Sequence, residues 1–233
     1  MTERTVFYVV ATPIGNLSDM SYRAIETLKS VDVILCEDTR VTKKLCDHYE
    51  ITTYRESYHA HSSDGKESSI ISRIKEGKTF ALVSDAGTPA VSDPGVKLIA
   101  SVRELGEGVD IVAIPGPTAL ITALVSTGFS GNDFRFFGFI PHKKGRKAFF
   151  ESIAEHPSIA ICYESPHRVI KTLQTLSGHD SFKSRIICVA RELTKTFEEK
   201  QYGTALELFE FFSENPGKVV SDLIEYALEK LVS

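Results

Sequence analysis

The sequence has no tryptophan, only two methionines and four cysteines among its 233 residues. The cysteines form no Cys-x-x-Cys pair, so the commonest zinc and dithiol redox motifs are absent. Cys36, Cys162 and Cys188 lie within apolar runs, where a reduced cysteine packs as a small hydrophobic residue. We therefore expect free thiols, as in a cytoplasmic protein.

Long apolar runs are also missing. No stretch approaches the ~20 consecutive apolar residues that a membrane-spanning helix needs, and the opening MTERTVFYVV lacks the apolar core and cleavage site of a secretory signal. Hydrophobic residues make up 42% and charged residues 25% of the chain, which is typical of globular proteins. These features predict a cytoplasmic protein without a membrane partner.

An excess of positive charge is absent as well, because the net charge is −4. A nucleic-acid-binding protein of this charge must concentrate its cations locally. The segment 141–147 does so and supplies the candidate RNA contacts Lys143, Lys144, Arg146 and Lys147. The alternative is a solvated loop after a strand, 134–140, whose phenylalanines we expect to be core residues.

Apolar strands alternate with amphipathic helices along the chain, which predicts an α/β fold. The pattern indicates strands at 7–11, 31–36, 80–83, 109–114, 134–140, 159–163 and 186–190. It indicates helices at 21–29, 39–48, 68–75, 118–125, 146–155, 166–176 and 205–212, and one that begins near Pro94. Pro115-Gly116-Pro117 interrupts regular structure and divides the chain into domains 1–115 and 116–233.

The C-terminus shows helical spacing of its apolar residues. Leu223, Ile224, Ala227, Leu228 and Leu231 recur at intervals of three or four positions. This predicts a short helix over 221–232 and an incomplete last strand in the second domain.

The stretch 84–95, SDAGTPAVSDPG, is rich in residues that form turns. It follows a buried strand and ends in Asp93-Pro94, which favours a helix with Asp93 as N-cap and Pro94 as first residue. In open α/β sheets, ligands bind at the carboxyl ends of strands. Gly87 lets the backbone approach a ligand and Asp85 supplies a carboxylate, although a purely structural turn explains the same composition.

A dinucleotide-type Gly-x-Gly-x-x-Gly motif follows none of the expected strands. Turns rich in Pro, Gly, Ser and Thr stand in its place at 12–16, 84–89 and 115–119. Such turns present backbone N–H and C=O groups, which suit the edges of an adenine ring and a carboxylate.

Six blocks together resemble one family. They are VATPIGNL at 10–17, EDTR at 37–40, SDAGTPAVSDPG at 84–95, IPGPTA at 114–119, YESPHR at 163–168 and RELTK at 191–195. In this order they resemble blocks of the bacterial small-subunit ribosomal RNA ribose 2′-O-methyltransferases, a branch of the tetrapyrrole methylase superfamily.

The resemblance implies two α/β domains of the tetrapyrrole methylase type, with S-adenosylmethionine in the cleft between them. It implies transfer of a methyl group to a ribose 2′-hydroxyl, of a cytidine, in 16S ribosomal RNA, by a homodimer. The cofactor-contacting positions that it indicates are Pro13, Gly15, Ser84, Asp85, Ala86, Gly87, Thr88, Pro117, Thr118, Ala119, Tyr163, Ala190, Arg191, Glu192 and Leu193.

Methyl transfer to a hydroxyl needs in-line alignment and benefits from a base. Asp38 is one candidate base, with Arg40 to bind a phosphate. Lys195, beside Glu192, is the other, as base or as electrostatic anchor. The alternative for both clusters is an ion-pair network at an interface.

Two other groups of residues are weaker candidates for a catalytic or metal site. His167 fits a turn at a helix start better than a catalytic dyad. Cys46, His48, His59 and His61 match no common zinc spacing, so we expect no metal.

Two other functions are compatible with the sequence. A methyltransferase of the same superfamily with a small-molecule or tetrapyrrole acceptor would leave the basic segment 141–147 unused. A non-catalytic RNA-binding or ribosome-assembly module would not need the blocks 84–95 and 191–195.

Overall fold

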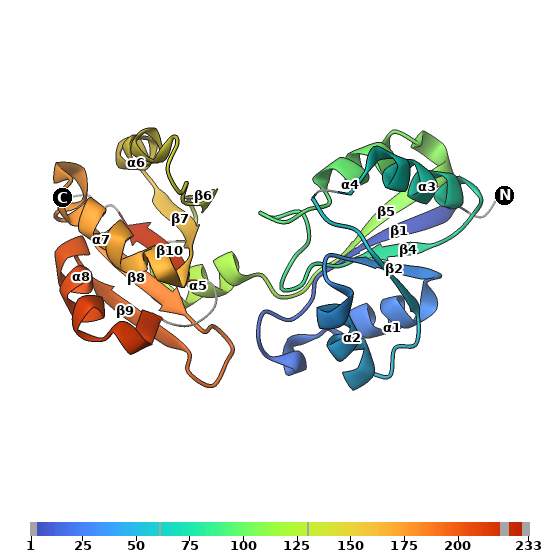
Figure 1. Cartoon of the computed structure of the whole chain (residues 1–233), viewed down its shortest axis with the longest axis horizontal. Helices are drawn as coiled ribbons and strands as arrows, with labels where there is room; N and C mark the ends of the chain where they lie inside the picture. Colours follow the sequence, from blue (N-terminus) through green and yellow to red (C-terminus); the bar gives the residue numbers. More distant parts are fainter. Residues whose placement is uncertain (1–3, 61, 130, 220–223, 230–233) are drawn as a thin grey trace. The chain divides into compact units, whose positions relative to one another are not determined.

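The structure, a computed structural model, describes residues 4–60, 62–129, 131–219 and 224–229 (Figure 1). The chain divides into two compact units, Met1–Thr118 and Ala119–Ser233. The division lies between Thr118 and Ala119, three residues after the boundary between 115 and 116 that the sequence predicts. Each unit contains one five-stranded sheet.

The N-terminal unit contains a fully parallel sheet with the order β3-β2-β4-β1-β5. Because all the strands run in one direction, their carboxyl ends meet at one edge of the sheet, the edge at which open α/β sheets bind ligands. Its strands are β1 (Thr5–Val10), β2 (Val33–Cys36), β3 (Tyr54–Ser57), β4 (Phe80–Leu82) and β5 (Val109–Ile114).

Helices cover both faces of this sheet. Figure 1 shows α1 (Tyr22–Ser30) and α2 (Thr39–His48) on one side, and α3 (Asp64–Lys75) and α4 (Val96–Arg103) on the other. Successive residues of β2 pack alternately, since Ile34 belongs to the core under α1 and α2 and Leu35 to the core under α3 and α4. Both side chains are fully buried, and each contributes about 1.5–3 kcal/mol through the hydrophobic effect.

The C-terminal unit has a mixed sheet with the order β6-β7-β10-β8-β9. Strands β6 and β7 are parallel, and β10 runs antiparallel between β7 and β8. The carboxyl ends of β6, β7 and β8 therefore lie at the same edge. The elements are α5 (Ala119–Thr127), β6 (Phe134–Phe139), α6 (Arg146–Glu155), β7 (Ile159–Glu164), α7 (Val169–Ser177), β8 (Ile186–Arg191), β9 (Glu199–Gly203), α8 (Ala205–Glu214) and β10 (Ile224–Glu229).

The prediction of a C-terminal helix is wrong over residues 224–229. These residues form β10, which pairs along its length with β7 on one side and β8 on the other. Two ladders of backbone hydrogen bonds override the helical spacing of the apolar residues. The rest of the predicted helix, 221–223 and 230–232, lies outside the described residues.

The predicted start of α4 is also wrong. The helix begins at Val96 after Gly95, which has φ 122° and no side-chain cap bond, so neither Asp93 nor Pro94 takes the predicted position. Two strands were missed, the polar segments β3 and β9, and both lie at sheet edges. The prediction of free thiols is confirmed, because all four cysteines are free and buried.

Gly95 provides a test of this packing. A Cβ on Gly95 would lie 2.7 Å from Leu82 Cδ2, and its φ is positive. We expect Gly95→Ala to lower the free energy of unfolding by about 2–4 kcal/mol in urea denaturation. The control Gly108→Ala, where a Cβ meets nothing within 4 Å, should stay within about 0.5 kcal/mol of the wild type. Equal stability of both variants would contradict the structure of this turn.

Candidate functional site

Three turns at the carboxyl edge of the N-terminal sheet are bonded to one another. Thr12 after β1 and Gly87 after β4 exchange backbone hydrogen bonds of 2.9 and 3.0 Å. The Thr12 hydroxyl donates to the Ser84 carbonyl at 3.1 Å. The Thr88 hydroxyl donates to the carbonyl of Pro117, after β5, at 3.0 Å. The turns predicted to bind a ligand are thus joined by hydrogen bonds at this edge.

Two glycines allow these turns to pack closely. Gly87 has φ 85°, and a Cβ there would lie 3.2 Å from Ile14 Cγ2 and 3.8 Å from the Pro117 carbonyl oxygen. A Cβ on Gly116 would lie 3.0 Å from the Cβ of Ala11. Larger residues at either position would separate the turns.

The predicted cofactor residues of this unit differ in exposure. Gly15, Asp85 and Ala86 are exposed, while Pro13 is buried. The Ser84 hydroxyl is also buried and donates to the Gly87 carbonyl at 3.0 Å, so it shapes the turn from within.

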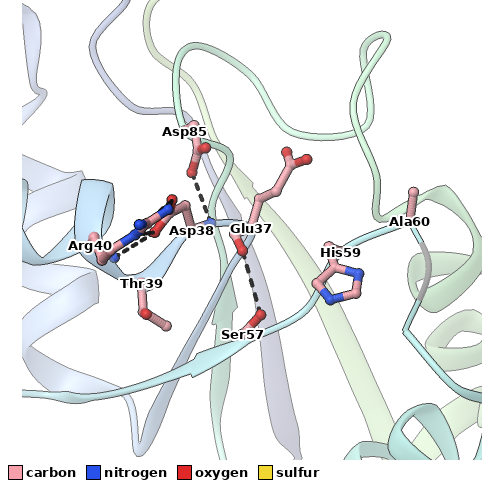
Figure 2. Close-up of a pocket in the computed structure, with 8 residues that line it drawn as sticks. All are labelled: Glu37, Asp38, Thr39, Arg40, Ser57, His59, Ala60 and Asp85. Atoms are coloured by element: carbon pink, nitrogen blue, oxygen red, sulfur yellow. Dashed lines mark hydrogen bonds and ion pairs between the residues drawn. The ribbon is translucent and has the colours of Figure 1, made fainter.

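A polar hollow of about 630 Å³ opens beside these turns, at the ends of β2, β3 and β4 (Figure 2). Figure 2 shows Asp85 directed at the backbone of Asp38, whose N–H donates to Asp85 Oδ1 at 3.1 Å. The lining residues are Glu37, Asp38, Thr39, Arg40, Ser57, His59, Ala60 and Asp85.

The Asp38 carboxylate is engaged within its own helix start. It accepts a bond from the Arg40 backbone N–H at 2.8 Å, as the N-cap of α2, and pairs with the Arg40 guanidinium at 2.6 Å. Hydrogen bonds from the Arg40 side chain and backbone lower the pKa of Asp38 to about 2. At neutral pH this carboxylate is a weak proton acceptor.

Asp93 is the functional candidate that the sequence did not reveal, because it was expected to cap a helix. It lines a second hollow of about 410 Å³, which shares His59 and Ala60 with the first. The pKa of Asp93 is raised to about 6, mainly by burial. A hydrogen bond from Ser84 opposes this shift, and the charges of Glu37 and Asp85 add to it. Burial also raises the pKa of Asp85.

In the C-terminal unit, the predicted residues gather at one sheet edge. Tyr163 lies near the end of β7, is 6% exposed and makes edge-on contacts with Phe136 and Phe139 of β6. Glu164 of β7 and Arg191 of β8 both pair with Ile224 of β10, so the turns after β7 and β8 lie at the same edge.

The turn after β8 is held by ion pairs. Glu192 and Thr194 adopt positive φ values of 52° and 68°. The Lys195 Nζ lies 3.1 Å from Glu192 Oε1, and the Thr194 N–H donates to a carboxylate oxygen of Glu198 at 2.7 Å. Ala190 and Leu193 are buried, and Arg191 pairs with the Glu199 carboxylate of β9 at 2.5 Å.

The basic segment follows β6 at this edge. Lys143, Lys144 and Lys147 are exposed, whereas the Arg146 side chain is only 16% exposed and turns toward Glu164. The structure therefore separates Arg146 from the three lysines. Of the phenylalanines expected in the core, Phe139 is 46% exposed, so that expectation is wrong at this position.

The remaining candidates lie apart from these contacts. His167 is exposed in the short 3-10 turn Pro166–Arg168. Within the described residues no three His, Cys, Asp or Glu side chains are grouped to hold a metal ion, and His61 is not among these residues. No helix in the described ranges is long and apolar enough to span a membrane.

The sequence and the fold match a known class of protein. The sequence model of the Tetrapyrrole (Corrin/Porphyrin) Methylases matches residues 6–208. Solved structures share the fold, among them diphthine synthase (TM-score 0.70, 12% identity, 98% of this chain and 91% of that chain) and a cobalt precorrin-4 methyltransferase (TM-score 0.69, 15% identity, 95% and 94%). The chain belongs to the tetrapyrrole methylase family.

Within this family, the chain is similar to proteins named ribosomal RNA small subunit methyltransferase I. The protein of that name from Synechocystis sp. is 45% identical over 217 residues, which cover 91% of this chain and 76% of the relative. The one from Bacillus subtilis is 44% identical over 211 residues, with coverage of 90% and 71%. The resemblance seen in the sequence is confirmed.

The raised pKa of Asp93 predicts a pH-dependent stability. The folded-state pKa of about 6 exceeds the ordinary 3.8, so the proton on Asp93 stabilises the fold fully below about pH 4, and this contribution is lost as the pH rises through 6. Asp93→Asn should therefore match the wild type near pH 4 and be more stable by about 1–2 kcal/mol near pH 8, after allowance for solvent screening.

Urea denaturation of both proteins at the two pH values measures this difference. The exposed control Asp47→Asn should show no gain at the higher pH. A stability difference between Asp93→Asn and the wild type that is the same at both pH values would refute the assignment.

Proposed function

We propose that the chain is a methyltransferase that transfers a methyl group from S-adenosylmethionine to a ribose 2′-hydroxyl, that of a cytidine, in small-subunit ribosomal RNA. The observation that carries this proposal is 41–45% identity over most of the chain to relatives named ribosomal RNA small subunit methyltransferase I. Those names favour neither a small-molecule acceptor nor a non-catalytic module.

The residues of the N-terminal unit fit S-adenosylmethionine. The turns around Thr12, Gly87 and Pro117 are bonded to one another at the sheet edge where ligands bind, and Gly87 allows their close packing. The exposed Asp85 carboxylate can accept hydrogen bonds from ribose hydroxyls or an ammonium group. When bound, this cofactor supplies a methyl group on a positively charged sulfur.

We propose that residues of both units contact the cofactor. In the first unit they are Pro13, Gly15, Ser84, Asp85, Ala86, Gly87, Thr88, Pro117 and Thr118. In the second they are Ala119, Tyr163, Ala190, Arg191, Glu192 and Leu193.

Lys195 is our candidate for the residue at the acceptor hydroxyl. In the reaction a bond forms between the 2′-oxygen and the methyl carbon, the carbon–sulfur bond breaks, and the hydroxyl proton leaves. As an ammonium held beside Glu192, Lys195 Nζ can orient the oxygen and stabilise the charge that develops on it; only in its neutral form can Nζ accept that proton. Asp38 is the weaker candidate for the base, because its pKa is lowered and its carboxylate is paired with Arg40.

Arg40 and the exposed lysines are candidates for RNA contact. Arg40 has a side chain that is 88% exposed and lies at the polar hollow, where it can bind a phosphate. Lys143, Lys144 and Lys147 supply three exposed cations on one segment, in a chain whose net charge is negative.

We further propose a homodimer in the cytoplasm. Exposed apolar side chains on α5, Ile121 at 39% and Val125 at 74%, support an apolar contact with a second copy.

The cofactor site is tested by Asp85→Ala. Loss of a hydrogen bond to a carboxylate should weaken S-adenosylmethionine binding by about 1–3 kcal/mol in calorimetry. The control Asp47→Ala, at an exposed position of α2, should bind as the wild type does. Unchanged affinity in Asp85→Ala would remove this residue from the site.

Catalysis is tested by comparing Lys195→Met with Asp38→Asn. A general base contributes about 10²–10⁴-fold, so Lys195→Met should lose that much in single-turnover rate at saturating RNA, with cofactor affinity preserved. Asp38→Asn should stay within about tenfold of the wild type. A Lys195→Met rate within about threefold of the wild type would show that this residue is not the base.

A further inference from the structure

Glu164 is a fully buried carboxylate with four donors around it. It is 0% exposed. Its Oε1 lies 2.5 Å from Arg168 Nη2 and accepts from the Ser165 N–H at 2.8 Å. Its Oε2 accepts from the Thr172 hydroxyl at 2.7 Å and lies 3.5 Å from Arg146 Nη1. A buried charge with this many partners fixes the positions of all of them.

Both arginines also hold the start of the basic segment. Arg168 Nη1 donates to the Ile140 carbonyl at 3.1 Å, and Arg146 Nη1 donates to the Pro141 carbonyl at 3.0 Å. Arg146 Nη2 donates to the Thr172 hydroxyl at 2.6 Å. Residues 140–146 are therefore fastened at both ends to one carboxylate at the end of β7.

Between these two attachment points lie the exposed cations Lys143 and Lys144. The chain turns back through Gly145, which has φ 81° and no neighbour around a Cβ position, and enters α6 at Arg146. No residue of the turn 142–145 is buried, so core packing does not fix its position. Among the described contacts, those of Arg146 and Arg168 with Glu164 hold the turn in place.

We propose that Glu164, acting through Arg146 and Arg168, is a positioning residue that sets the basic turn 142–145 for binding to the RNA phosphates. This inference rests on the proposed function. It removes Arg146 from the set of phosphate contacts predicted from the sequence. Instead, Arg146 belongs to a clamp that Glu164, Arg146, Arg168 and Thr172 form together. The guanidinium is suited to this role because its planar donors reach Pro141, Glu164 and Thr172 together, which an ammonium cannot do.

The decisive variant is Arg146→Lys, which keeps the charge and removes the planar set of donors. If Arg146 served only as a cation for phosphate, lysine would replace it with little loss. If it fastens the turn, Arg146→Lys should raise the KM for RNA by about five- to tenfold, with kcat and S-adenosylmethionine affinity unchanged. The matched control is Lys183→Arg, at a side chain of the same unit that is 62% exposed and lies outside the basic segment, and its KM should stay at the wild-type value.

A double-mutant cycle identifies the route of the effect. In a Lys143→Ala/Lys144→Ala background, Arg146→Lys should raise KM by less than about twofold, because the clamp acts through those lysines. A full additional increase in that background, or a wild-type KM in Arg146→Lys alone, would overturn the proposal. Thr172→Val, which removes the bridging hydroxyl in a side chain of similar shape, should repeat the result with a milder change.

Hydrogen exchange separates this proposal from the proposed function. The amides of residues 142–145 should exchange faster in Arg146→Lys than in the wild type or in Lys183→Arg, with the rest of the unit unchanged. If Lys143→Ala/Lys144→Ala leaves RNA binding unaltered, the turn does not bind RNA. The proposal is then wrong, even if hydrogen exchange shows that Arg146 holds the turn. Unchanged exchange in Arg146→Lys would instead overturn the clamp alone.

Discussion

The direction of the strands is the constraint on which the candidate site depends. Five parallel strands in the N-terminal unit bring all their carboxyl ends to one edge, so turns that are far apart in sequence become neighbours. In the C-terminal unit the same result arises differently, because β10 runs antiparallel between β7 and β8 and leaves those two strands pointing the same way. Each unit thus collects its polar turns at one edge.

Within the first unit, main-chain bonds convert this proximity into a defined surface. The paired amides of Thr12 and Gly87 join the turns after β1 and β4, and the Thr88 bond to Pro117 adds the turn after β5. Burial raises the pKa of Asp93 and Asp85 beside these turns, and the charges of neighbouring carboxylates add to the shift. In the second unit the buried Glu164 carboxylate pairs with Arg146 and Arg168 and so fixes the positions of these two side chains.

Much of this arrangement could be predicted from the sequence, and the errors have physical causes. Buried strands such as β2 and β7 can be predicted because they are apolar runs in the sequence, and the turn-rich blocks indicate where strands end. Strands β3 and β9 were missed because edge strands keep polar residues, as YRES and EKQYG do. Strand β10 was read as a helix because local spacing carries no information about the two partner strands that pair with it.

The site residues show the same limit. The turn that contains Asp85 and Gly87 could be predicted from its composition, whereas the burial of Asp93 and the inward direction of Arg146 depend on contacts distant in sequence. A basic residue in a basic segment is expected to face solvent, and only the buried Glu164 shows why Arg146 does not.

The central claim, methylation at a ribose, is tested most directly by chemistry on the product. Small-subunit ribosomal RNA from cells without this protein is incubated with the purified chain and methyl-labelled S-adenosylmethionine, and the RNA is then hydrolysed with alkali. A methyl group on the 2′-oxygen blocks its attack on the adjacent phosphodiester, so the account predicts label in an alkali-resistant dinucleotide that begins with cytidine. Label in single nucleotides, which places the methyl on a base, or no transfer to RNA would contradict it.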